Sequence, residues 1–170
     1  LLFPFSGLLE KLACRLIPDS KDAAESADDK IQILDERLLA TPAVALGRCQ
    51  EVAETMARIS MDAMKTSCQL IRQYDARSAA AIRRTEGEAD QYEDMLGTYL
   101  VKLGSSDLTA QDSRTSAKIL HIIGDFERIS DHAVNVVESA EEMKSKGLRF
   151  SPEASHEMHV MTGAVGEIMD

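Results

Sequence analysis

The feature that most constrains the fold is a row of small and apolar residues that recurs every three or four positions along the first half of the chain. Its members are Leu46, Cys49, Ala53, Met56, Ser60, Ala63, Ser67, Leu70 and Tyr74. This spacing places all of them on one side of an α-helix, and the small members allow a neighbouring helix to approach closely. A long helix with one apolar side must bury that side against other helices. The sequence therefore predicts an all-α fold.

Proline and glycine residues set the limits of the predicted helices. Pro42 follows Thr41, a good capping residue, and proline suits the first turn of a helix. Gly104 and Gly147 each follow an amphipathic stretch, as a glycine that ends a helix does. The predicted helices span about 42–74, 77–103, 109–146 and 151–170. Because the connections between the first three are short, we expect an antiparallel three-helix bundle followed by the start of a fourth helix.

The N-terminal 33 residues are predicted to be a separate segment and linker, ahead of a bundle at 34–150 and the fourth helix at 151–170. Residues 1–9 (LLFPFSGLL) are apolar but too few for a membrane span, which needs about 20. They are either the end of a transmembrane helix or an amphipathic segment that packs on the domain. Residues 5–17 suit a short helix and 19–29 a polar linker, whereas 34–41 suit either helix or extended chain.

The net charge, the cysteines and the motifs that are missing argue against several classes of function. A formal net charge of −10 disfavours nucleic acid and anionic membrane surfaces, both of which attract basic patches. The three cysteines are far apart in sequence and form no Cys-x-x-Cys motif, which fits free thiols in a reducing compartment. No nucleophile with an adjacent base and no glycine-rich phosphate loop is present, so we do not predict an enzyme.

Two helices carry the same pair of acids at the same place. Glu127 and Asp131 lie one turn apart on the third predicted helix, at the border of its apolar stripe. Glu86 and Asp90 repeat this arrangement on the second helix. Two like charges one turn apart destabilise a helix unless something cationic lies beside them. Four carboxylates on facing helices would suit a hard metal cation.

The alternative is that these acids pair with basic side chains or face solvent at the edge of the bundle. The candidate basic partners are Arg83, Arg84, Lys118 and Arg128. Periodicity alone leaves both interpretations open.

The sequence of the third predicted helix resembles a known family. Residues 125–138 (DFERISDHAVNVVE) are similar to the signature of the PhoU family, and 86–90 (EGEAD) resemble its other half-motif. Residues 34–46 (LDERLLATPAVAL) resemble the segment that introduces the PhoU-like domain of bacterial sodium/phosphate cotransporters. Residues 1–9 would then end the last membrane helix. Ser130 stands where the motif usually has glycine.

The resemblance implies a regulatory, metal-binding domain of a sodium-dependent phosphate transporter, acting in phosphate uptake on the cytoplasmic side of the inner (plasma) membrane. It implies iron, zinc or another divalent cation as the bound metal, and the transporter's membrane domain in the same polypeptide as the partner. Only the first of the family's two repeats is complete here. The implied metal ligands are Glu86, Asp90, Glu127 and Asp131, with Asn135 and Glu138 nearby.

Two other functions stay open. A ferritin-like di-iron carboxylate enzyme needs Glu-x-x-His motifs that point inward, and the one such motif here, Glu153 to His156, is predicted to face solvent. A purely structural helical interaction module is the second, with methionines forming an adaptable surface. Formation of a homodimer is one way to bury the apolar N-terminal run and the fourth helix.

Overall fold

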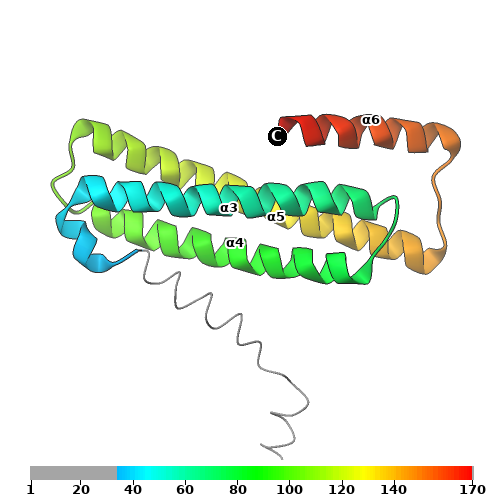
Figure 1. Cartoon of the computed structure of the whole chain (residues 1–170), viewed down its shortest axis with the longest axis horizontal. Coiled ribbons are helices and arrows are strands. Elements are labelled where there is room, and N and C mark those ends of the chain that lie inside the picture. Colours follow the sequence, from blue (N-terminus) through cyan, green and yellow to red (C-terminus); the bar gives the residue numbers. More distant parts are fainter. Residues whose placement is uncertain (1–33, 170) are drawn as a thin grey trace, which may run out of the picture. The chain divides into compact units, whose positions relative to one another are not determined.

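The computed structural model describes residues 34–169, and every regular element in this range is a helix (Figure 1). The elements are a 3₁₀ helix η2 (Glu36–Ala40) and four α-helices, α3 (Pro42–Leu70), α4 (Ala76–Leu103), α5 (Ala110–Lys146) and α6 (Pro152–Ile168). The prediction of an all-α fold is confirmed. The features predicted for residues 1–33 lie outside the described residues. Residues 36–170 form one compact unit of the chain.

The three long helices pack against one another, each contacting the other two. In Figure 1 the sequence colours run in opposite directions along α3 and α4, and reverse again in α5. One core cluster joins the C-terminal part of α3, the N-terminal part of α4 and the C-terminal half of α5. Its buried members are Ala63, Leu70, Ala79, Ile82, Ala133, Val137 and Ala140. Four of the seven are alanines, so the helix backbones can lie close together.

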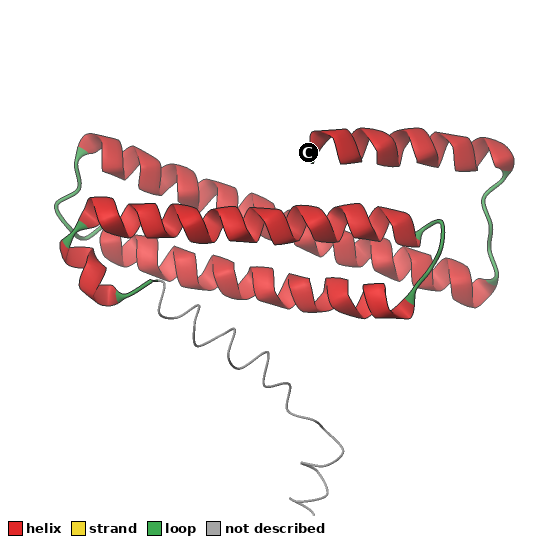
Figure 2. Ribbon diagram, viewed as in Figure 1, coloured by secondary structure: helices red, strands yellow, loops and turns green. Residues whose placement is uncertain are grey.

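The apolar row of α3 forms its buried side, as the spacing predicts. All eight members from Leu46 to Leu70 are buried. Tyr74 is the exception because α3 ends at Leu70, before the predicted limit of about 74. Asp75 caps the next helix by accepting a hydrogen bond from the Ser78 amide at 2.8 Å. The chain therefore uses residues 71–75 as the connection between α3 and α4 (Figure 2).

The predicted capping residues behave differently from one another. Gly147 has a φ of 63°, and the Leu148 amide donates to the Met143 carbonyl at 2.9 Å, as in a left-handed glycine cap. Gly104 also follows its helix directly, but its φ of −61° is right-handed. Thr41 precedes α3 without capping it through its side chain, because its hydroxyl donates to the Leu38 carbonyl at the end of η2. Residues 34–41, for which the sequence suits either helix or extended chain, contain the 3₁₀ helix η2.

Two buried serine hydroxyls have no hydrogen-bond partner within the described part of the chain. They belong to Ser60 of α3 and Ser130 of α5, both about fully buried. A buried hydroxyl without a partner costs stability. Serine at these two positions is therefore explained by its small size, which lets the helices approach, and not by its polarity.

Helix α6 is joined to the rest of this unit by a small interface. None of its residues is buried, and its contacts are mainly with α3. Val160, Met161 and Ile168 on α6 are more than half exposed. Among the described residues, none of the helices combines the length and the apolar character that a membrane span requires.

Tyr74 anchors the α3–α4 connection to α5. Its hydroxyl donates to Glu141 Oε1 at 2.8 Å, and the Lys144 ammonium lies 4.4 Å from the centre of its ring. Arg83 of α4 makes two further hydrogen bonds to the same carboxylate, at 2.7 and 3.0 Å. The Glu141 carboxylate thus joins α5 to α4 and to the connection. These hydrogen bonds, led by those from Arg83, lower the pKa of Glu141 from 4.5 to about 2.

We expect Glu141→Gln to lower the free energy of unfolding at neutral pH. Because the native pKa is below the unfolded value, the ionised carboxylate stabilises the fold above pH 4.5, and this contribution is lost as the pH falls towards about 2. The difference from the wild type should therefore shrink over the same range. Urea unfolding at a series of pH values measures it.

Glu142→Gln is the matched control, because Glu142 pairs only with Lys146 one turn along the exposed side of α5. An equal effect of the two substitutions would contradict the anchoring role of Glu141.

Candidate metal site

The predicted ligands lie on the middle turns of α4 and α5. Glu86 and Asp90 come from α4, and Glu127, Asp131, Asn135 and Glu138 come from α5. Glu86 and Glu127 are half-buried, whereas Asp90, Asp131, Asn135 and Glu138 are exposed. The two half-buried glutamates are therefore the members nearest the core, and the aspartates lie further out.

Glu127 has the most perturbed surroundings of this group. Burial raises the pKa of its carboxyl most, and negative charges on neighbouring acids raise it further. Of those acids, Glu93 has the largest effect, followed by Asp131, Asp90 and Glu86. Three of these four belong to α4. The negative charges of both helices thus act on one carboxyl group.

Glu93 is a site residue that the sequence-based ligand set leaves out. It is half-buried on α4, two turns from Glu86. A β-carbon placed on Gly124 of α5 would lie 3.4 Å from Glu93 Oε1. The absence of a side chain at Gly124 gives the Glu93 carboxylate room beside α5. The helical spacing places Glu93 on the same border as Glu86, and this spacing is the sequence signal that points to Glu93.

The predicted basic partners are engaged elsewhere or are not paired with these acids. Arg83 binds Glu141, and Arg128 lies 3.8 Å from Asp125, which is exposed. Within residues 34–169, no ion pair involves Glu86, Asp90, Glu93, Glu127 or Asp131. The interpretation in which lysine or arginine neutralises the acids is therefore not supported.

Asn135 and Glu138 have different neighbours. Asn135 donates from Nδ2 to Asp131 Oδ2 at 3.4 Å, a long hydrogen bond that places the amide beside this carboxylate. The negative charge of Glu138 contributes to raising the pKa of Arg83, after the larger effect of the hydrogen bond to Glu141. Glu138 therefore lies towards the Arg83–Glu141 pair, on the far side of Asn135 from Glu127.

The donor set suits a hard cation in its chemistry, but the side chains are not arranged as ligands of one ion. Oxygen donors are those that hard divalent cations bind. In the described part of the chain, no three His, Cys, Asp or Glu side chains are grouped closely enough to hold a metal.

The histidines do not complete a metal-binding group with these acids in the described part of the chain. His121 and His132 on α5 are exposed, and so are Glu153 and His156 on α6. The carboxylates of α4 and α5 therefore form the candidate site without an imidazole among them.

Comparison with known proteins identifies the family of this region. Residues 53–140 match the PhoU domain family, a range that runs from the middle of α3 through α4 to most of α5. The match covers just over half of the 170 residues and includes the predicted ligands and Glu93. No curated protein and no solved structure matches the chain significantly.

We expect Glu127→Gln to stabilise the metal-free protein at neutral pH, by about the few tenths of a kcal/mol typical of exposed charge pairs. Because the native pKa of Glu127 is raised, its ionised form costs stability at neutral pH, and that cost disappears as the pH falls and the carboxyl binds a proton. Urea unfolding in the presence of a chelator measures the difference.

Asp125→Asn is the control, since Asp125 is exposed and pairs with Arg128 on its own helix. A loss of stability in Glu127→Gln would mean that the repulsion between the acids of α4 and α5 is absent.

Proposed function

Because the chain belongs to the PhoU domain family, we propose that it is a regulatory domain of phosphate homeostasis whose α4–α5 acids bind a divalent cation. The family assignment supports a regulatory rather than a catalytic role. The support for the cation site comes instead from particular residues of this chain.

The observation that supports it best is the position of Glu127. Its half-buried carboxyl is subject to negative charge from both helices, and the described residues supply no ion-paired lysine or arginine to offset that charge. A divalent cation would replace the repulsion with attraction to each carboxylate. It would also join α4 to α5, so occupancy of the site would change the stability of the bundle.

The residues that would hold the ion are Glu86 and Asp90 from α4 and Glu127 and Asp131 from α5. Glu93 supplies a fifth carboxylate on the buried side. Asn135 would orient Asp131 through its amide hydrogen bond, as outer groups commonly orient metal ligands. Bound there, the metal would supply positive charge and a link between helices. The resemblance of the motif to its family favours iron or zinc.

We further propose that the domain acts on a sodium-dependent phosphate transporter at the cytoplasmic side of a membrane. The support is the likeness of residues 34–46 to the segment that introduces PhoU-like domains in such transporters, together with the apolar stretch at 1–9. In that setting the three long helices are the family's helical repeat unit and α6 belongs to a second one. A homodimer of the domain would cover the apolar side chains that α6 exposes.

We expect protein purified without chelator to contain stoichiometric iron or zinc, and Asp131→Ala to lose it. Asp131 is exposed, so its truncation should leave the fold intact while removing one ligand. Elemental analysis measures the metal. Asp125→Ala, an acid on the same helix outside the site, should retain the wild-type content.

The same two variants test the regulatory role. Placed in the gene that encodes the whole protein, Asp131→Ala should change cellular phosphate uptake and Asp125→Ala should not. Protein free of metal after loading with iron or zinc would contradict the cation site. In that case unchanged uptake would favour a purely structural interaction module.

A further inference from the structure

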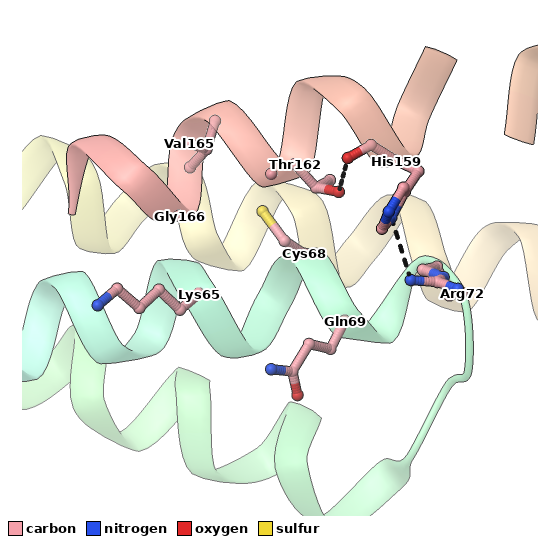
Figure 3. Close-up of a pocket in the computed structure, with 9 residues that line it drawn as sticks. Lys65, Cys68, Gln69, Arg72, His159, Thr162, Val165 and Gly166 are labelled. Atoms are coloured by element: carbon pink, nitrogen blue, oxygen red, sulfur yellow. Dashed lines mark hydrogen bonds between the residues drawn. The ribbon is translucent and has the colours of Figure 1, made fainter. Parts of the chain in front are cut away.

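A cavity of about 290 Å³ lies between the C-terminal half of α3 and α6, away from the acids of α4 and α5 (Figure 3). In Figure 3 Cys68 points from α3 towards α6, while His159 of α6 and Arg72, in the connection after α3, point towards each other. Gly163 and Gly166 line the α6 side, and a β-carbon added to either would meet no atom within 4 Å. These glycines leave the space between the helices open.

The cavity has a positive lining in an acidic chain. Lys65, Arg72 and His159 contribute to its wall, and no aspartate or glutamate among the described residues does, although the chain carries a net charge of −10. Asp75, three residues after Arg72, is engaged by both the amide and the hydroxyl of Ser78 at 2.8 Å. The described side chains that line the cavity are therefore basic or neutral, although the chain as a whole is acidic.

Arg72 and His159 form the end of the cavity that can bind a ligand through both helices. Arg72 Nη1 lies 3.4 Å from His159 Nδ1. A guanidinium can only donate, so Nδ1 accepts and the ring carries its proton on Nε2. The other guanidinium N–H groups make no hydrogen bond or ion pair with residues 34–169. Lys65 lies two helical turns away, about 10 Å along α3.

We propose that this cavity is a binding site for a small oxyanion, with Arg72, just after the end of α3, and His159 of α6 as its principal donors. A guanidinium presents parallel N–H groups that match the oxygens of a phosphate or a carboxylate. The imidazole adds a donor from the opposite helix, and the glycines of α6 leave room for the anion. This site is independent of the cation site, since it shares none of its residues.

The chemistry of the remaining lining agrees with an anion and disfavours a metal. Burial raises the pKa of the Cys68 thiol, so the sulfur stays protonated and is a poor metal ligand. The lining offers one neutral thiol and one histidine as metal ligands, and the positive charges of Lys65 and Arg72 beside them repel a metal ion.

Binding there would fasten α6 to α3. The interface between these helices is small, and α6 buries no residue of its own. An anion held by Arg72 and His159 together binds only when α6 is docked, so it stabilises the docked position by mass action. The oxyanion would thus control whether the exposed apolar side chains of α6 are presented from a fixed or a detached helix.

The test uses the full 170-residue chain with chelator present and inorganic phosphate as the probe, at constant ionic strength. We expect phosphate to shift the NMR signals of the His159 ring in a saturable way. Hydrogen exchange of α6 amides should become about tenfold slower when phosphate is about ten times its Kd. Exchange in α4 should not change, because α4 does not line the cavity.

Arg72→Gln should weaken phosphate binding by about tenfold or more, since it removes the charge-assisted hydrogen bonds. Arg58→Gln is the matched control, an exposed arginine of α3 outside the cavity, and it should bind within about twofold of the wild type. His159→Gln supplies an independent variant on α6. Equal weakening by the Arg72 and Arg58 substitutions, or unchanged α6 exchange at saturating phosphate, would overturn the proposal.

Discussion

The electrostatic repulsion between the acids of α4 and α5 is the interaction on which the functional account depends. The fold creates it through packing, because a core rich in alanine brings the two helix backbones close together. Gly124 lets the Glu93 carboxylate lie beside α5, and Glu127 stays half-buried at the border. A chain selected only for stability would gain from replacing one of these acids by lysine. Their presence fits the proposed role of these acids in binding a cation.

Much of the fold could be predicted because helix limits and helix faces are local properties. The apolar row of α3 and the glycine after α5 are read directly from spacing and residue type. The end of α3 at Leu70 could not be read in this way, because Tyr74 continues the apolar spacing but lies in the connection, where it contacts Glu141 of α5. The burial of Ser130 could not be read from the sequence either. Its polarity suggests exposure, but helix packing buries it, and its hydroxyl has no hydrogen-bond partner among the described residues.

The sequence indicates where on α4 and α5 the candidate site lies more readily than which residues belong to it. Helical spacing places Glu86, Asp90, Glu127 and Asp131 on matching borders, and the charges of the first, second and fourth all act on Glu127. Spacing places Glu93 on the same border as Glu86, but its effect on Glu127 depends on the relative rotation of α4 and α5, which the sequence does not give. The cavity beside His159 was not predictable at all, since it requires knowing where α6 docks on α3.

The central claim is that the acids of α4 and α5 act on Glu127 strongly enough to favour a bound cation. The most direct test is an NMR titration of the Glu127 side-chain carboxyl, first with chelator and then with zinc. The account predicts a pKa above the ordinary value of 4.5 in the metal-free protein, and a lower pKa once zinc is present. An ordinary pKa that zinc leaves unchanged would contradict it.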